Sequence, residues 1–141
     1  MEFFDALVRY EIALWNVVDQ ELSRAELVSL GQLHALRIVD TYDGQARVQE
    51  LSSDIGITVG AASKLVDRLE RDGLAERSPN PANRRSSLIS LTPTGRQALA
   101  AGLEVAGAAV DRAVEGEDVQ TLTAGLARLQ MRLDSLVEAP A

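Results

Sequence analysis

The 141-residue sequence has no cysteine, which excludes a disulfide framework, a thiolate metal site and a thiol redox switch. It has a single histidine, so a histidine-based metal site is not expected. Only 4% of the residues are aromatic, so the core is expected to consist mainly of Leu, Val and Ala. No uncharged apolar run approaches the roughly 18 residues of a membrane span. The first residues lack the basic region of a signal peptide. The sequence therefore predicts a cytoplasmic protein with no membrane partner, no cofactor and no metal.

Basic residues are outnumbered by acidic ones, 14 to 21, and the net charge of −7 at first argues against a nucleic-acid partner. The distribution of charge argues otherwise. Residues 1–44 carry −5 and residues 97–141 carry −4, whereas residues 45–96 carry +2. Such asymmetry indicates that the central segment has a different partner from its flanks. On charge alone, chance stays open as the alternative explanation.

The spacing of apolar residues predicts a mainly α-helical chain. Three helices are expected first, over about residues 3–22, 30–41 and 48–55. Gly56 interrupts the pattern, and Thr58 is suited to cap the amino terminus of a fourth helix. Gly73 follows the last turn of that helix, where glycine is favoured.

A short hairpin is expected after the fourth helix. Two strands, residues 74–78 and 87–91, flank a stretch of turn-forming residues, 79–83. Thr92 and Pro93 then have the character of the N-cap and first residue of a fifth helix. That helix runs to about residue 114, and its inward side chains are expected to include Leu99, Leu103, Ala106 and Val110.

The sixth helix carries leucines in alternating steps of four and three residues, at Leu122, Leu126, Leu129, Leu133 and Leu136. This seam of about two heptads is short for a free coiled coil but suits a dimer interface. Residues 138–141 are expected to be disordered. A single domain, 1–141, is expected, with a DNA-binding lobe at 30–96 and a helical dimerisation region at 1–29 and 97–141.

Residues 47–96 have the order helix, turn, helix, hairpin that is typical of a winged helix-turn-helix binding duplex DNA. A helix that enters the major groove needs an exposed amino-terminal half with small and polar side chains. The candidates here are Thr58, Gly60, Ala61, Ser63 and Lys64, with Arg68 one turn further along. Lys64 can reach a guanine acceptor or a phosphate, and Arg68 is better placed for phosphate. For these two residues alone, a solvated helix face is an equally good explanation.

Acidic residues moderate the basic character of the fourth helix. Asp67, Glu70 and Asp72 lie among its basic residues, and Asp67 is expected to pair with Arg71 four positions later. Acids on a recognition helix weaken non-specific binding. We therefore expect modest DNA affinity with a steep salt dependence.

Arg84 and Arg85 lie at the expected tip of the hairpin. A narrow, A·T-rich minor groove concentrates negative potential and attracts inserted arginine side chains. Charged hairpin tips are common, so the pair alone is a weak signal. Its position about 20 residues after a capped helix makes it a stronger indication of a DNA-binding wing.

These segments resemble the MarR family of bacterial regulators. The resemblance rests on residues 51–58 (LSSDIGIT), 66–74 (VDRLERDGL), 83–86 (NRRS) and 91–95 (LTPTG), and the helical order extends it to nearly the whole chain. It implies an obligate homodimer with interleaved first, fifth and sixth helices, bound to double-stranded DNA at a pseudo-palindromic operator. It also implies a transcriptional regulator, usually a repressor, released by a small aromatic or anionic effector.

The tip of the hairpin departs from the family pattern. The family commonly has Asp-x-Arg there, and the aspartate orients the arginine that enters the minor groove. This chain has Asn83, Arg84 and Arg85 instead. Asparagine can accept a hydrogen bond but supplies no charge. By this match, Arg85 is the minor-groove candidate and Arg84 a phosphate contact.

Four residues are candidates for the effector pocket that the resemblance implies: Tyr10, Trp15, His34 and Arg37. Packing in the core or the interface is the favoured role for Tyr10 and Trp15. His34 has the character of a packed or half-exposed helix residue, and Arg37 could balance an effector carboxylate.

Three functions compete. The first is a dimeric, ligand-responsive, DNA-binding repressor. The second is a winged-helix protein-interaction module with no direct DNA role, which the acidic flanks keep open. The third is a small helical enzyme. With one histidine and no cysteine, its candidates reduce to carboxylates, and none lies in a nucleophile, phosphate-loop or paired-acid motif. The sequence does not indicate an enzyme.

Overall fold

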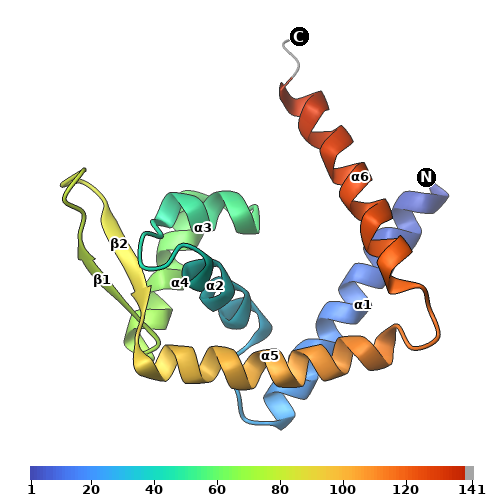
Figure 1. Cartoon of the computed structure of the whole chain (residues 1–141), viewed down its shortest axis with the longest axis horizontal. Coiled ribbons are helices and arrows are strands. Elements are labelled where there is room, and N and C mark those ends of the chain that lie inside the picture. Colours follow the sequence, from blue (N-terminus) through green and yellow to red (C-terminus); the bar gives the residue numbers. More distant parts are fainter. Residues whose placement is uncertain (139–141) are drawn as a thin grey trace. The chain divides into compact units, whose positions relative to one another are not determined.

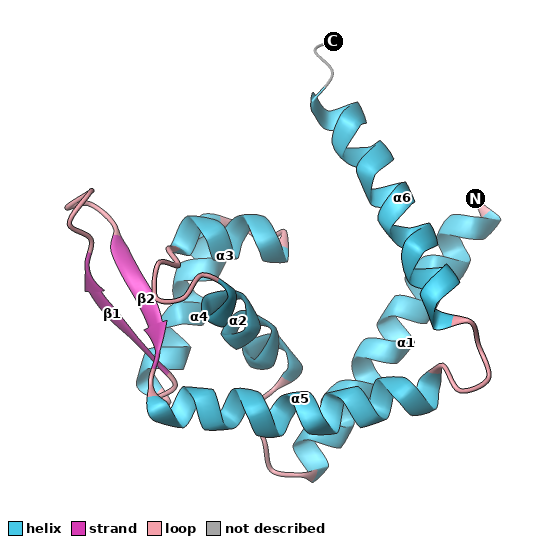
Figure 2. Cartoon of the chain, in the orientation of Figure 1, coloured by secondary structure: helices cyan, strands magenta, loops and turns pink. Residues whose placement is uncertain are grey.

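The computed structural model describes residues 1–138 and is mostly helical, with one small sheet (Figures 1 and 2). The elements are α1 (Glu2–Arg24), α2 (Leu30–Thr41), α3 (Val48–Ile55), α4 (Val59–Arg71), β1 (Ala75–Pro79), β2 (Ser87–Leu91), α5 (Pro93–Ala113) and α6 (Val119–Glu138). The predicted fold class, mainly α with a β wing, is confirmed. Disorder was wrongly expected at Glu138, which ends α6, and the same expectation for residues 139–141 lies outside the described residues.

Two compact units make up the chain, Met1–Val110 and Asp111–Ala141. The first holds α1 to α4, the hairpin and most of α5. The second, described to residue 138, holds the end of α5 and α6. The predicted division into a lobe at 30–96 and helical flanks stays a prediction.

The core of the first unit is a continuous apolar cluster beneath the helix-turn-helix. Its largest fully buried side chains come from α1, α2, α3, α4 and β2, and are Leu22, Leu33, Leu36, Val39, Leu51, Val66, Leu69 and Ile89. The inward face predicted for α2 is confirmed. Because these side chains interlock α3 and α4 with α2 and the sheet, the exposed face of α4 is presented on a rigid support.

Strands β1 and β2 form an antiparallel pair in which Ala75 lies opposite Leu91 and Pro79 opposite Ser87. The chain before α3 adds a single bridge, because the backbone N–H of Ile89 donates to the carbonyl oxygen of Ala46 at 2.7 Å. The predicted strand of residues 74–78 begins one residue later than expected. The hairpin is therefore tied to the entrance of α3 as well as to the core.

Helix α5 packs through a stripe of small residues. Its buried positions are Gly95, Leu99, Gly102 and Ala109, in steps of four, three and seven. Leu103 lies beside this stripe and is 41% exposed, so the prediction that it faces inward was wrong. The side chain of Leu33 fills the space where a Cβ on Gly102 would lie, which brings α5 close to α2.

Large apolar side chains remain exposed on α1 and on α6. On α1 only Val18 and Leu22, near its carboxyl end, are buried, while Phe3, Tyr10 and Trp15 are between 42% and 64% exposed. The five seam leucines of α6 are between 40% and 72% exposed. None of the helices within residues 1–138 is both long and apolar enough to span a bilayer.

Candidate nucleic-acid interface

The turn between α3 and α4 is fixed by local hydrogen bonds. Gly56 adopts a left-handed conformation with φ of 75°, which only glycine takes readily. The hydroxyl of Ser52 donates to the carbonyl oxygen of Ile57 at 2.6 Å. Thr58 caps α4 as predicted, since its side chain accepts a hydrogen bond from the backbone N–H of Ala61 at 3.2 Å. These contacts set the angle at which α4 leaves the turn.

Helix α4 separates a buried stripe from an exposed face. Ala62, Leu65, Val66 and Leu69 are buried, as their spacing predicted. The candidate recognition residues Gly60, Ala61, Lys64 and Arg68 are exposed, and Ser63 is half-buried. The amino-terminal half of α4 therefore presents small side chains and one cation to solvent, which is the surface that a major groove can accept.

Arg77, in the middle of β1, holds the hairpin against α4. Its guanidinium forms ion pairs with Asp67, at 2.9 Å, and with Glu70. The backbone N–H of Arg77 also donates to Glu70 at 3.1 Å. The predicted pair between Asp67 and Arg71 was wrong, because Asp67 pairs with Arg77 and Arg71 pairs with Asp72. A contact across the fold thus replaces the one expected along the helix.

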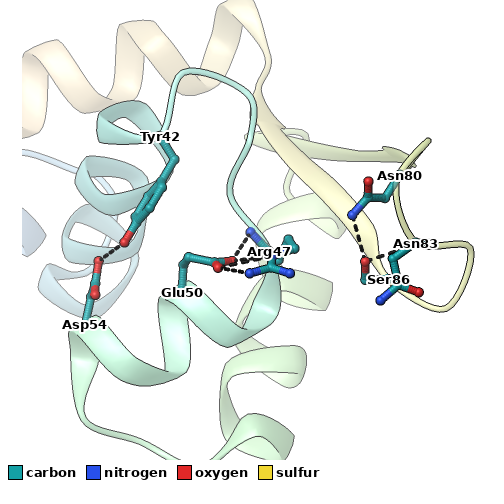
Figure 3. A network of polar contacts seen from close by, with 7 residues as sticks. All are labelled: Tyr42, Arg47, Glu50, Asp54, Asn80, Asn83 and Ser86. Atoms are coloured by element: carbon teal, nitrogen blue, oxygen red, sulfur yellow. Dashed lines mark hydrogen bonds and ion pairs between the residues drawn. The ribbon is translucent and has the colours of Figure 1, made fainter.

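Polar side chains order the tip of the hairpin (Figure 3). Asn80, only 8% exposed, donates from Nδ2 to the hydroxyl of Ser86 at 2.9 Å and accepts from the backbone N–H of Ala82 at 3.0 Å. Asn83 accepts from the backbone N–H of Arg85 at 3.0 Å. Asn83 therefore retains the accepting role expected of it, although its partner is backbone rather than a guanidinium.

Four cations on α4 and the hairpin tip are free of ion pairs with any residue in 1–138: Lys64, Arg68, Arg84 and Arg85. All four are exposed. The arginines that do form ion pairs include Arg77, whose charge is taken up by the two α4 carboxylates. The exposed cations are thus available to an external anion, while the acids beside them on α4 are already paired. Such a surface can bind phosphate oxygens.

Two further contacts hold α3 in place (Figure 3). Arg47 at its N-cap donates to Glu50, and this hydrogen bond holds the pKa of the Glu50 carboxyl below its ordinary value. The hydroxyl of Tyr42 donates to Asp54 at 3.0 Å, which raises the pKa of the Tyr42 hydroxyl. Both pairs tie the ends of α3 to neighbouring chain and keep the first helix of the motif in place.

The candidate effector residues are divided between two places. His34 and Arg37 line a hollow of about 250 Å³ between α2 and α5, together with Leu99 and Leu103. Burial and the nearby Arg37 lower the pKa of His34, so the ring is neutral at pH 7. Trp15 lines a different hollow, on α1, and Tyr10 lines neither. Within residues 1–138, no group of three or more histidine, aspartate and glutamate side chains is placed to hold a metal ion.

The sequence did not single out Arg77 or Asn80. Arg77 carried a weak signal, because a charged residue stands where strand alternation places an inward side chain on β1. Asn80 lies between two prolines and was treated only as a turn residue. The partners of Arg77 are 7 and 10 positions away, beyond the spacings that helix patterns address.

Comparison with known proteins gives the same fold. Residues 28–87 match the model of the MarR family. The HTH-type transcriptional regulator YfiV of Bacillus subtilis (strain 168) is 25% identical over 111 residues, which covers 77% of this chain and 69% of YfiV. The multiple antibiotic resistance protein MarR of Salmonella typhimurium is 41% identical over 46 residues, covering 33% of this chain and 32% of that protein.

Among solved structures, a mutant MarR from E. coli complexed with operator DNA superposes with a TM-score of 0.82. It is 20% identical, and the match covers 92% of this chain and 94% of that one. At this identity the likeness establishes the fold. The shared fold includes the helices on either side of residues 28–87.

Proposed function

We propose that the chain is a homodimeric, sequence-specific DNA-binding repressor of the MarR family, whose members are transcription regulators and not enzymes. The match of residues 28–87 to the family model and the likeness to an HTH-type transcriptional regulator over 77% of the chain support this proposal. A repressor of this kind acts in the cytoplasm, where bacterial DNA lies. Its α4 enters the major groove and its hairpin lies over the adjacent minor groove.

The observation that carries this proposal is the set of four free cations. Lys64 and Arg68 lie on α4, and Arg84 and Arg85 at the hairpin tip, all exposed and without an ion pair in residues 1–138. The chain as a whole has a net charge of −7, so the free cations on α4 and the hairpin tip stand against the overall composition. Phosphate neutralisation by such cations supplies affinity, and contacts in the grooves supply sequence preference.

The exposed apolar seam of α6 and the exposed side chains of α1 support a homodimer. Contiguous apolar surface of this kind is stabilised by a partner, and a second copy of the chain supplies an identical seam. Two lobes related by a twofold axis then meet half-sites about one helical turn, ~34 Å, apart. The operator is accordingly a pseudo-palindrome.

The effector site belongs to the same proposal. The hollow lined by His34, Arg37 and Asp40 also holds the apolar side chains of Leu99 and Leu103, and Arg37 is the group there that would pair with a small aromatic anion. The hollow lies between the DNA-binding lobe and α5. An effector there changes the separation of the two recognition helices, and a mismatch of a few ångströms loses the contacts of one half-site.

The test is binding to the DNA upstream of the chain's own gene across a salt series. Native protein should bind with a steep salt dependence, because each phosphate contact releases counterions. Lys64→Ala should weaken binding by about 1–3 kcal/mol if Lys64 reads a base. Arg85→Ala should weaken binding mainly to sites with A·T-rich flanks. Adding benzoate or a larger aromatic carboxylate to the same assay tests the effector.

Arg24→Ala is the matched control, because it removes one positive charge from α1, outside the proposed interface. It should leave DNA binding close to native. If native protein shows no salt-sensitive binding to the upstream region or to random duplex, the repressor proposal fails. The winged-helix lobe would then be assigned to protein interaction, for which salt-insensitive binding of a protein partner is the expected sign.

A further inference from the structure

Arg77 occupies an unusual position for a charged residue. It lies opposite the fully buried Ile89 in the sheet and on the same face of β1 as the buried Ala75. Its side chain is 25% exposed, much less than the neighbouring surface arginines such as Arg71 at 70%. An apolar side chain at this position would pack on α4. Instead, a guanidinium reaches the helix.

The guanidinium contacts one stripe of α4. Ser63, Asp67 and Glu70 lie at steps of four and three, so they share a face of the helix. Arg77 Nη1 forms ion pairs with both carboxylates, and Nη2 donates to the carbonyl oxygen of Ser63 at 3.5 Å. Its own backbone N–H donates to Glu70 at 3.1 Å. One residue of the hairpin is therefore joined to two turns of the candidate recognition helix.

This stripe is separate from the cations that face solvent. Lys64 and Arg68 follow Ser63 and Asp67 by one position each, which places them about 100° around the helix. Arg77 therefore leaves the free cations untouched. It joins β1, the strand that leads to the hairpin tip with Arg84 and Arg85, to α4. Hydrogen bonds to charged partners are the stronger kind in proteins, and the planar guanidinium fork restricts their geometry.

We propose that Arg77 is a positioning residue that holds the hairpin at a fixed angle to α4, so that Lys64 and Arg85 engage one DNA duplex at the same time. The inference rests on the proposed DNA-binding function and extends it. Arg77 itself does not contact DNA. It acts through Arg85, whose contact is productive only while α4 is seated in the neighbouring groove.

Two simpler roles predict different behaviour. If Arg77 only neutralises Asp67 and Glu70, its loss matters because two carboxylates then face the phosphates, and removing those carboxylates restores binding. If Arg77 only stabilises the fold, its loss lowers the melting temperature but leaves the contribution of Arg85 unchanged in folded protein. Positioning alone predicts that Arg85 loses its contribution to binding when Arg77 is replaced.

The experiment is a double-mutant cycle on DNA affinity in the full chain. Arg85→Ala is introduced into native protein, into Arg77→Met, and into the triple variant Arg77→Met, Asp67→Asn, Glu70→Gln. Coupled residues show interaction energies of about 0.5–3 kcal/mol, which is about 2- to 150-fold in affinity. If Arg85→Ala weakens native binding about tenfold, it should weaken binding by less than about twofold in both variants.

The outcomes separate the inference from the proposed function. If native protein does not bind DNA, both are overturned. If native protein binds and Arg85→Ala has its full effect in the triple variant, positioning is overturned and charge neutralisation remains. If Arg77→Met does not fold, the double variant Asp67→Ala, Glu70→Ala keeps Arg77 but removes both of its carboxylate partners. It must then show the same loss of coupling, and full coupling there overturns the proposal.

A second readout is independent of DNA. Because the chain has no cysteine, Ser53→Cys on α3 and Ala82→Cys at the hairpin tip can be spin-labelled without other changes. Labelled protein diluted with unlabelled protein reports the distance within one chain. A narrow distribution should broaden in Arg77→Met measured below its melting transition. An unchanged distribution would show that the hairpin is held by its other contacts and would overturn the proposal.

Discussion

At the start of α5, Gly95 has no side chain, and this allows the helix to approach the backbone of Leu74 closely. A Cβ on Gly95 would lie 1.8 Å from the carbonyl oxygen of Leu74. Backbone cannot move aside as a side-chain end can. The backbone N–H of Thr92 also donates to that same carbonyl at 3.1 Å, so the segment before the hairpin is held against the beginning of α5.

We expect Gly95→Ala to lower the free energy of unfolding by about 1–3 kcal/mol or more, as other over-packed sites do. Urea unfolding followed by circular dichroism measures this. Gly107→Ala is the matched control in the same helix, since nothing lies within 4 Å of its added Cβ. The control should raise stability by up to about 1 kcal/mol, because alanine is the better helix former. Native-like stability of Gly95→Ala would contradict the close approach.

These two glycines differ in a way that sequence patterns do not reveal. Both stand in one helix, and neither has a local signal for what lies opposite. Gly102 also lies at a close approach, with Leu33 Cδ1 2.6 Å from an added Cβ. Gly107 faces open space. What distinguishes them is a neighbour distant in the chain.

At the scale of single elements, α3 depends on the contact between Arg47 and Glu50. The hydrogen bond from Arg47 lowers the pKa of Glu50 below its ordinary value of 4.5. A carboxyl whose folded pKa is lowered contributes stability that is present above its unfolded pKa. That contribution is lost as the pH falls through the folded pKa. The stabilising effect of Glu50 is therefore complete at neutral pH and absent in strong acid.

Glu50→Gln should therefore lower the melting temperature at pH 7. The loss of stability between about pH 5 and pH 3 should also become shallower than in native protein, since one titrating group is gone. Melting curves at half-unit pH steps measure both effects. Glu76→Gln removes an exposed carboxyl that makes no ion pair within residues 1–138, and it should retain the native acid profile. If the two variants had identical pH profiles, Glu50 would not contribute to the loss of stability in acid.

Most elements could be predicted because their signals are local. Thr58 and the pair Thr92–Pro93 mark the starts of α4 and α5, and the inward residues of α2 follow helical spacing. The predictions were wrong where contacts between segments distant in the sequence determine the pairing or packing of a residue. Asp67 has Arg71 in reach along α4 but pairs with Arg77 on β1. Leu103 fits the helical pattern but lies beside the small-residue stripe that packs.

The sequence predicted which residues form the candidate DNA surface, but not which contacts they make with other elements. Lys64, Arg68 and the two hairpin arginines were identified from their spacing and charge, and their exposure agrees with that role. The sequence could not show that Asp67 and Glu70 are already paired, because their partner lies in another element. The expectation that these acids weaken DNA binding stays a prediction.

At the scale of the whole molecule, the proposed dimer depends on the leucine seam of α6. The seam leucines of α6 share one face, and Met131 lies on the opposite face at 72% exposure. Leu129→Glu places a charge in the middle of the seam, whereas Met131→Glu places the same charge outside it. We expect Leu129→Glu to be monomeric and Met131→Glu to remain dimeric.

Light scattering after size-exclusion chromatography measures the mass of each variant. The monomer should also lose most of its affinity for a pseudo-palindromic site, because a single lobe contacts one half-site. A dimer of native mass for Leu129→Glu would show that the α6 seam is not the interface. Monomeric native protein would leave the exposed seam without the partner proposed for it.

All basic residues of this chain are arginines except Lys64, which lies in the proposed DNA interface. Lys64 is the sole lysine in the sequence, and it is exposed on the face of α4 proposed to enter the groove. Chemistry directed at primary amines is therefore confined to Lys64 and the amino terminus. Acetylation could act as a switch at a single atom of the interface. An amine-reactive label followed by mass spectrometry would likewise report, at that one side chain, whether the groove is occupied.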